Sequence, residues 1–144
     1  MDYCFLFLSS KNIPEIIPLI QRFTNHKFTD DILSERYQNM FTENYECVGI
    51  YQGKELIGLT GLWYQTRHYA GKSCEVDHVF IEEKHRNNGL GKKLFSFIEA
   101  HVNRKGCEAL ELNTYVDNAL SHKFYYNRGF SIIGFHFVKN IGKK

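Results

Sequence analysis

The residues best suited to chemistry lie between Glu75 and Val102, where a polar run leads into two closely spaced glycines and then a helical apolar pattern. The run ends in Arg86-Asn87-Asn88-Gly89-Leu90-Gly91, and Lys92 and Lys93 follow directly. Glycines at the start of a helix let the backbone approach a ligand, and the unpaired first-turn amides and the helix dipole favour an anion. The segment predicts a phosphate or pyrophosphate site, with a plain glycine turn before a surface helix as the alternative.

Two well-known phosphate loops do not match this segment. The P-loop needs a Gly-Lys-Ser/Thr ending, whereas two lysines follow Gly91. The dinucleotide fingerprint needs a third glycine near the position that Leu94 occupies. Any phosphate site here is therefore of another type.

Two carboxylates precede the loop in a strand-like run. Glu75 and Asp77 are two residues apart, so on a regular strand both point to one face. Close carboxylates can raise the pKa of one of them toward the range of a general base. Ordinary surface carboxylates on a solvent-facing strand are the alternative, and the residues alone leave both interpretations open.

The elements that must position these residues follow from the apolar pattern. A continuous apolar run predicts a strand at Tyr3–Leu8, and helical spacing predicts helices from about Ile13 to Phe23 and from about Thr29 to Phe41. Further strands are predicted at Tyr45–Tyr51, Glu55–Tyr64, Cys74–Ile81 and Glu108–Tyr115, with a loop at Gln65–Ser73. One further helix is predicted to end at Gly106, and another to run from Asp117 or Asn118 to about Arg128. A closing strand or hairpin is predicted at Phe130–Lys139. The order βααβββαβαβ(β) indicates a mixed α/β domain with antiparallel middle strands.

Composition narrows the classes of function. The formal charge of +2 lacks the clustered positive footprint of a nucleic-acid binder, and no segment approaches the roughly 18 apolar residues of a membrane helix. The short apolar run near the N-terminus lacks the basic lead of a signal peptide. The histidines and cysteines show no metal spacing. We therefore expect a reduced, cytoplasmic, single-domain protein over residues 1–144 without a metal, nucleic-acid or membrane partner.

Two motifs together resemble the GCN5-related N-acetyltransferases (GNAT family). Arg86, Gly89 and Gly91 match the family's Arg/Gln-x-x-Gly-x-Gly/Ala pyrophosphate loop between a strand and a long helix. Residues 118–125 followed by Gly129-Phe130 resemble its Asn-x-x-Ala-x-x-Phe/Leu-Tyr motif and the Gly-Phe that comes after. Asn87 stands where glycine is common and Ser121 where alanine is common. The resemblance extends over residues 3–139.

The resemblance implies a GNAT-like fold with roughly six to seven strands in a mixed, mostly antiparallel sheet and about four helices. It also implies acetyl-CoA as the acetyl donor, with its pyrophosphate on the loop amides and its pantetheine arm beside the strand before the loop. An oxyanion donor is expected at a backbone amide near Val79 or Phe80. The residues expected to bind the cofactor are Val79, Phe80, Ile81, Arg86, Asn87, Asn88, Gly89, Leu90, Gly91, Lys92, Asn118, Ser121 and Tyr125.

The same resemblance assigns catalytic roles. Glu75 falls where the family's catalytic strand often carries Glu or His, and Asp77 falls on a second such position. Tyr125 matches the family's tyrosine, and a phenol with an intrinsic pKa near 10 can protonate a departing thiolate. Packing is the alternative role for Tyr125. The base remains open between Glu75, Asp77 and a chain of waters.

The acceptor is expected to be a primary amine of a small molecule, attacked directly. Part of the chain looks like the small-molecule branch that contains aminoalkylphosphonate acetyltransferases. Residues expected near the acceptor are Phe28, Trp63, Glu75 and His122. A protein lysine or N-terminal acetyltransferase and a non-catalytic CoA-binding regulatory module remain as alternatives. Dimers are common in the family, so a homodimer is one assembly that the resemblance allows.

Overall fold

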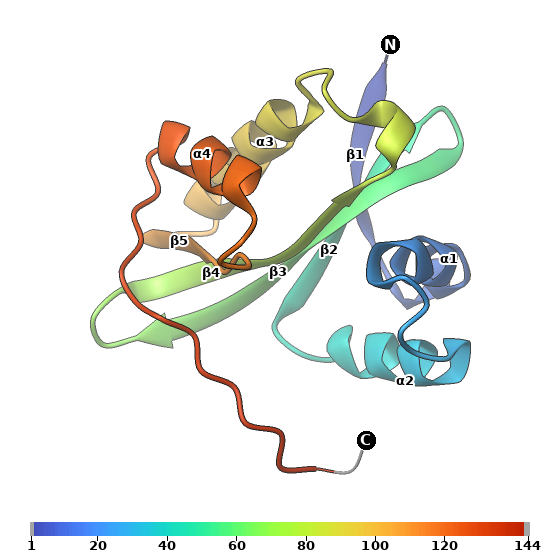
Figure 1. Ribbon diagram of the computed structural model, residues 1–144, viewed down its shortest axis with the longest axis horizontal. Coiled ribbons are helices and arrows are strands. Elements are labelled where there is room, and N and C mark those ends of the chain that lie inside the picture. Colours follow the sequence, from blue (N-terminus) through green and yellow to red (C-terminus); the bar gives the residue numbers. More distant parts are fainter. Residues whose placement is uncertain (1, 143–144) are drawn as a thin grey trace. The chain divides into compact units, whose positions relative to one another are not determined.

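A five-stranded sheet in the order β1-β2-β3-β4-β5 organises the chain, whose residues 2–142 the computed structural model describes (Figure 1). The strands are β1 (Tyr3–Leu8), β2 (Tyr45–Gln52), β3 (Glu55–Arg67), β4 (Gly71–Ile81) and β5 (Ala109–Leu112). The α-helices are α1 (Ile13–Thr24), α2 (Asp30–Met40), α3 (Leu90–Arg104) and α4 (Ala119–Asn127), and 3-10 turns cover Ser10–Asn12 and Glu83–His85. The first four strands pair antiparallel, which confirms the predicted meander.

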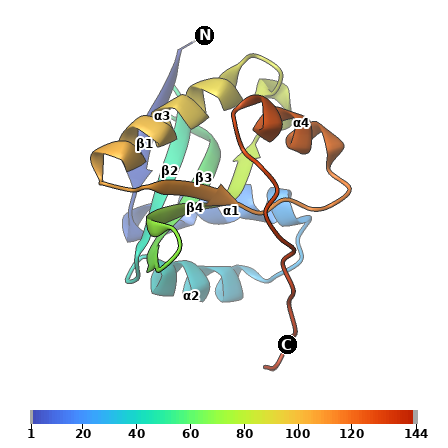
Figure 2. The same cartoon turned by 90° about the vertical axis from the view of Figure 1, so that its left-hand side faces the viewer.

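The structure divides into two compact units, the first ending at Glu111 and the second beginning at Leu112. In the first unit, α1 and α2 cover one face of the sheet and α3 covers the other (Figures 1 and 2). Apolar residues of α1, including Ile16 and Leu19, share one core with Cys47 and Leu59 of the sheet. On the opposite face, α3 buries an apolar stripe consisting of Leu90, Leu94, Phe95, Ile98 and Val102. Helical spacing of apolar residues therefore produces the two covering layers, as predicted.

The predicted hairpin between β2 and β3 is confirmed and is tight. Gly53 has a φ of +62°, a backbone conformation that glycine adopts without steric cost. The next hairpin differs from the prediction of a loop over residues 65–73, because β3 extends to Arg67 and β4 begins at Gly71. Gln65 and Thr66 pair with Ser73 and Lys72 despite their polarity. Ladder hydrogen bonds depend on the backbone alone, so polar side chains do not end a hairpin whose strands remain in register.

The second unit contains α4, and it corrects the expected strand count. Asn118 caps α4 by accepting a hydrogen bond from the amide of Ser121 at 3.2 Å, and Gly129 follows the helix with a φ of +92°. The strand or hairpin predicted at residues 130–139 does not form, and its apolar side chains after Phe130 are exposed, Phe137 by 91%. An alternating apolar run becomes a strand only when a neighbour pairs with its backbone, and the described part of this unit offers none. Within residues 2–142 the sheet therefore has five strands rather than the expected six or seven.

The pairing of β3 with β4 contains one irregularity that shapes the later argument. Thr60 pairs with Val79 and Leu62 pairs with Val76, so Gly61 faces two residues, Asp77 and His78. Such a β-bulge inserts one extra residue into a strand and changes which face the following side chains occupy. No helix among residues 2–142 is long and apolar enough to cross a membrane.

Candidate functional site

The bulge in β4 places two consecutive polar side chains on the face covered by α1 and α2. Trp63 Nε1 donates a hydrogen bond to Asp77 Oδ2 at 3.1 Å, and His78 Nδ1 lies 3.3 Å from the same oxygen. On a regular strand, Asp77 and His78 would point to opposite faces, and only the extra residue opposite Gly61 brings them together. The structure thus joins predicted residues Trp63 and Asp77 with His78, to which no role was assigned.

His78 is held from the helical layer as well. Its Nε2 lies 3.4 Å from the hydroxyl of Tyr37 on α2, and its ring packs against Phe23 of α1 at 6.3 Å between centroids. Burial raises the pKa of Tyr37, with the charges of Cys47 and Asp77 adding to the effect, so the phenol stays protonated. An ionised carboxylate only accepts hydrogen bonds, so Nδ1–H of His78 donates to Asp77, and the Tyr37 hydroxyl contacts the other ring nitrogen.

These donors act on the ionisation of Asp77. The hydrogen bond from His78 lowers the pKa of this carboxyl, burial opposes that effect, and the charge of His78 and the Trp63 hydrogen bond lower it further, for a net lowering. The expectation that a close pair of carboxylates raises a pKa is therefore wrong for Asp77. The side chain is 45% exposed, while that of His78 is 12% exposed. Asp77 is an accessible anion held by largely buried partners.

Glu75 lies on the same face of β4, directly opposite Trp63 of β3. Its side chain is partly buried, whereas its neighbours Cys74 and Val76 face the opposite core. The register therefore agrees with the prediction that Glu75 and Asp77 share one face of the strand. Trp63 lies opposite Glu75 and donates a hydrogen bond to Asp77.

Gly61 and Tyr45 form the floor of this cluster. A Cβ atom on Gly61 would lie 2.7 Å from Cε1 and 2.8 Å from the hydroxyl oxygen of Tyr45, and 2.9 Å from Cε1 of His78. Glycine is therefore required by crowding here, and its absent side chain makes room for the two rings. The Tyr45 side chain is only 7% exposed, and burial raises the pKa of its phenol.

The predicted phosphate loop enters α3 with the backbone that an anion site needs. Asn87 has a φ of +65° and Gly89, the residue before α3, has a φ of +76°. Asparagine is among the few residues other than glycine that tolerate this left-handed region, which explains why it can replace the more common glycine. Residues 86–89 are exposed, and the first-turn amides of a 15-residue helix lie beside them.

The side chains of Arg86 and Asn88 form hydrogen bonds to neighbouring residues and so stabilise the loop. Arg86 Nε donates to the carbonyl of Ile81 at 2.7 Å, and its guanidinium lies over the ring of Phe80 at 5.6 Å. Asn88 Nδ2 donates to the hydroxyl of Tyr3 at 3.2 Å, and that hydroxyl contacts Nδ1 of the buried His85 at 3.0 Å. The Leu90 side chain is 2% exposed and belongs to the core. Only its amide can face a ligand, while the Lys92 side chain is exposed.

In the second unit, the structure brings three predicted residues together on α4. Asn118 and Ser121 share the capping hydrogen bond, and Tyr125 lies one turn further along the helix. Burial raises the pKa of Tyr125, so its phenol remains protonated at neutral pH and can donate a proton. His122 Nε2 lies 2.9 Å from the carbonyl oxygen of Tyr115.

A family model described as Acetyltransferase (GNAT) family matches residues 13–130, which include both the loop and α4. The chain belongs to this family. Both motifs found in the sequence lie within the matched region. The left-handed backbone of Asn87 and Gly89 and the exposure of residues 86–89 leave room for an anion at the start of α3.

Two curated relatives act on small amines, to judge from their names. The chain is 27% identical over 86 residues to an aminoalkylphosphonate N-acetyltransferase of Salmonella typhimurium, covering 59% of this chain and 56% of the relative. It is 28% identical over 95 residues to a spermine/spermidine N(1)-acetyltransferase of Bacillus subtilis, covering 62% of each. The matched region thus spans less than two thirds of either relative.

Solved structures show the GNAT fold throughout the chain. A ribosomal-protein-alanine N-acetyltransferase from Brucella melitensis biovar Abortus superposes with a TM-score of 0.80 at 18% identity, covering 97% of this chain and all of that one. An aminoglycoside N-acetyltransferase in complex with a CoA bisubstrate analogue gives 0.84 at 13% identity, covering 99% of this chain and all of that one. At such identities the likeness shows the fold and does not select a substrate.

Phe28, predicted near the acceptor, has its ring occupied by other contacts. The Arg36 guanidinium lies 4.5 Å and the Lys27 ammonium 5.5 Å from its centroid, and the ring packs against the α1/α2 core. The backbone carbonyl of Phe28 also accepts a hydrogen bond from Gln21. These contacts give Phe28 a structural role in the connection between the two helices.

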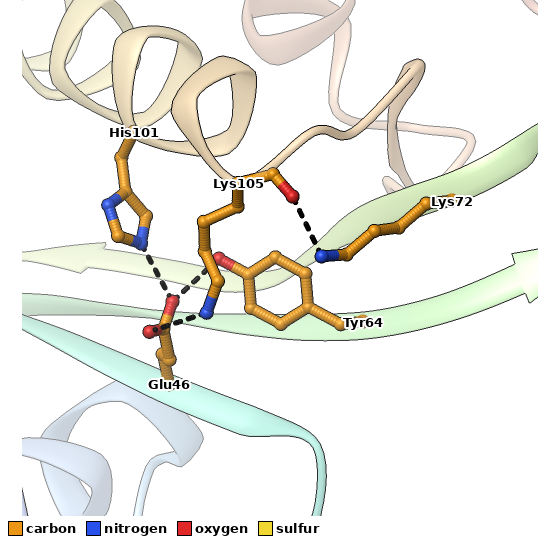
Figure 3. A network of polar contacts seen from close by, with 5 residues as sticks. All are labelled: Glu46, Tyr64, Lys72, His101 and Lys105. Carbon is orange, nitrogen blue, oxygen red and sulfur yellow. Dashed lines mark hydrogen bonds and ion pairs between the residues drawn. The ribbon is translucent and has the colours of Figure 1, made fainter.

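A second cluster of the same residue types lies on the face of the sheet that α3 covers (Figure 3). The carboxylate of Glu46 on β2 receives hydrogen bonds from Tyr64 at 2.6 Å, His101 at 2.9 Å and Lys105 at 3.1 Å. Lys72 donates to the carbonyl of Lys105 at 2.7 Å, which ties β4 to the end of α3. Burial opposes ionisation of Glu46, but these hydrogen bonds outweigh it and lower the pKa of the carboxyl.

Two of the four cysteines, Cys47 and Cys74, are poorly suited to forming an acyl-enzyme. Cys74 is fully buried, and burial raises the pKa of its thiol to about 12. Cys47 is likewise fully buried with its pKa raised to about 12 by burial. A thiol is nucleophilic as its thiolate, so neither side chain offers a reactive sulfur at neutral pH.

Proposed function

We propose that the chain is an acetyl-CoA-dependent N-acetyltransferase that acts on a primary amine of a small molecule by direct attack. The observation that carries this proposal is the pairing of an anion loop at the start of α3 with an accessible, ionised Asp77 on the strand that leads into that loop. Family membership supplies the donor, and the buried thiols favour transfer without a covalent enzyme intermediate.

The proposed reaction forms one C–N bond and breaks one C–S bond. An alkylammonium and acetyl-CoA yield an N-acetyl amide, free CoA thiol and one proton. Two protons must leave the nitrogen, one before attack to a base and one that ends on the thiol. This chain therefore has to provide a proton acceptor near the amine and a donor near the sulfur.

The roles of the chain's residues follow from their surroundings. Because the pKa of Asp77 is lowered, Asp77 is a better anchor for a cation than an acceptor of its proton, and the base is Glu75 or a water that it orients. We assign the acid to Tyr125, whose burial keeps the phenol protonated. The loop amides of residues 87–91 hold the pyrophosphate, and a backbone amide near Val79 or Phe80 supports the oxyanion.

A thiol-release assay with acetyl-CoA tests the proposal. The panel should contain aliphatic diamines, aminoalkylphosphonates, aminoglycosides, amino acids and lysine peptides. Release with small amines supports the proposal, and release with the peptides alone would indicate a protein acetyltransferase instead. Calorimetric binding of CoA without thiol release from any amine would indicate a non-catalytic binding module.

Two variants test the assigned roles. Tyr125→Phe should lower kcat by about 10- to 100-fold while CoA affinity stays unchanged, because only proton donation to the thiolate is lost. Glu75→Gln should shift the pH–rate profile upward, to conditions where the amine loses its proton unaided. Equal turnover of the first variant, or an unchanged profile of the second, would remove that residue from its role.

A further inference from the structure

We propose that Asp77 binds the positive charge of the acceptor, and that the acceptor is therefore an aliphatic diamine or polyamine rather than an amine carrying an anionic group. This inference rests on the proposed acetyltransferase function and names the class of its substrate. It assigns His78 as the positioning residue for the Asp77 carboxylate. The argument depends on charge, exposure and spacing within the first unit.

The only basic side chain that pairs with Asp77 among the described residues is the imidazole of His78. Its partners are the indole N–H of Trp63 and the imidazole of His78, both on Oδ2, and no Lys or Arg within the described residues forms an ion pair with it. From the helical layer, the groups that contact His78 are the uncharged Tyr37 and Phe23. These donors orient the carboxylate and keep it ionised, so that it can act on a ligand as an anion.

The carboxylate is also accessible. Asp77 is 45% exposed, whereas its partner His78 is 12% exposed and locked between α1, α2 and the bulge. Because His78 is largely buried and holds the exposed carboxylate of Asp77 in place, that carboxylate keeps its orientation when a ligand binds. An ammonium ion supplies the N–H donors that the carboxylate can still accept.

The spacing of acids and aromatic rings favours more than one positive charge. Glu75 and Asp77 lie on one face, about 6.6 Å apart along the strand at roughly 3.3 Å per residue. Trp63 lies opposite Glu75 and bonds to Asp77, so an alkyl chain between two ammonium groups would pass along its ring. Carboxylates at both ends and an indole between them suit a short diamine through charge and cation–π attraction.

The same pair of acids disfavours an acceptor with a negative group. A phosphonate close to Asp77 would meet a like charge that no lysine or arginine among the described residues pairs with, and like charges at short range are destabilising. The two curated relatives differ in this respect, since one is named for aminoalkylphosphonates and the other for spermine and spermidine. The geometry at Asp77 favours the polyamine type of acceptor.

The decisive experiment compares three amines of similar length by thiol release at saturating acetyl-CoA: putrescine, n-butylamine and aminopropylphosphonate. For the wild-type chain we expect kcat/KM to fall in that order. In Asp77→Asn, kcat/KM for putrescine should fall about 10- to 100-fold, mainly through KM, because a charge-assisted contact made before the transition state is lost. Turnover of aminopropylphosphonate should stay the same or rise. A wild-type preference for the phosphonate, or an unchanged order in Asp77→Asn, would overturn the inference.

His78 is tested by a pair of variants. His78→Asn keeps an N–H near Asp77 and should raise KM for putrescine by about 3-fold or less, whereas His78→Ala removes the donor and should raise it about 10-fold. A purely structural role would instead change kcat and CoA affinity together, equally in both variants. That result would remove His78 as a positioning residue.

The failure of this inference is distinguishable from failure of the proposed function. If wild-type chain binds CoA but releases thiol with no amine, the proposed function fails. If thiol is released with monoamines or phosphonates as efficiently as with putrescine, only the assignment of the acceptor fails. Calorimetric binding of putrescine to the CoA-loaded protein gives a readout that does not depend on turnover. If Asp77→Asn does not fold, the wild-type order of the three amines still decides.

Discussion

Two clusters built from the same residue types lie on opposite faces of one sheet. On the α3 face, Glu46 is surrounded by Tyr64, His101 and Lys105, and both of its oxygens accept hydrogen bonds (Figure 3). On the α1/α2 face, Asp77 accepts from Trp63 and His78 on one oxygen. The Glu46 side chain is 27% exposed and that of Asp77 is 45% exposed.

The two clusters differ in how completely the charge and the oxygens of each carboxylate are paired. Glu46 has a lysine partner and a full set of donors, so it connects β2, β3 and α3 and has little left to offer a ligand. Asp77 accepts from an indole and an imidazole on one oxygen, and its side chain is more exposed. A carboxylate, a histidine and a tyrosine do not by themselves define a binding site. A carboxylate whose charge is incompletely paired can bind a ligand, whereas one whose charge is fully paired stabilises the fold.

The largest expected effect comes from Glu46→Ala. Removing this carboxylate leaves two partly buried donors, Tyr64 and His101, and the exposed ammonium of Lys105 without their acceptor, so we expect a loss of about 2–3 kcal/mol in the free energy of unfolding. Thermal melting should fall by about 6–10 °C, read by circular dichroism. Acetyl transfer to putrescine at 25 °C should be unchanged.

Glu43→Ala is the matched control, because Glu43 is an exposed carboxylate close to Glu46 in sequence, and it should melt like the wild type. If Glu46→Ala melted normally and instead raised KM for the amine, the assignment of the two clusters would have to be exchanged.

The next effect tests the floor of the Asp77 cluster. Gly61→Ala would place a methyl group against the rings of Tyr45 and His78, so we expect a loss of about 2 kcal/mol from overpacking. Because His78 must move, KM for putrescine should rise as well, which distinguishes this variant from Glu46→Ala. Gly134→Ala, at an exposed glycine with open space around it, is the control and should change neither quantity.

Much of this architecture could be predicted from the sequence, because it depends on local patterns. The Tyr3–Leu8 strand, the apolar stripe of α3 and the capping of α4 by Asn118 are each encoded within a few residues. The loop was predicted from Arg86, Gly89 and Gly91, and its left-handed Asn87 agrees with that interpretation.

The features that sequence reasoning missed depend on pairing between distant segments. His78 joins Asp77 because Gly61, on another strand, faces two residues instead of one, and no spacing within β4 reveals that. The only available signal was a glycine in the middle of β3, which often marks a bulge or a close approach of backbone. The predicted final strand failed for the related reason that an apolar run does not specify its partner.

Acid titration of stability should separate the clusters further. The pKa of each carboxyl is lowered in the folded chain, so each contributes stability that is present above its unfolded pKa of about 4 and is lost as pH falls through the lower folded pKa. Urea unfolding between pH 6 and pH 3 should show the advantage of wild type over Glu46→Gln shrinking with acidification. The corresponding difference for Asp77→Asn should be several-fold smaller, because solvent screens the more exposed group. An equal pH dependence for the two variants would contradict the contrast.

The smallest expected effects come from removing one hydroxyl in each cluster. Tyr64→Phe deletes a short hydrogen bond to a charged oxygen and should cost about 1–1.5 kcal/mol, measured by urea unfolding. Tyr37→Phe deletes a longer contact of 3.4 Å to a histidine and should cost about 0.5 kcal/mol. The kinetic effects should have the opposite rank, because Tyr37 orients His78 whereas Tyr64 supports only Glu46. We expect KM for putrescine to rise about 2-fold in Tyr37→Phe and to stay unchanged in Tyr64→Phe. If both variants changed KM equally, the buried row from Tyr37 to Asp77 would not be what positions the acceptor.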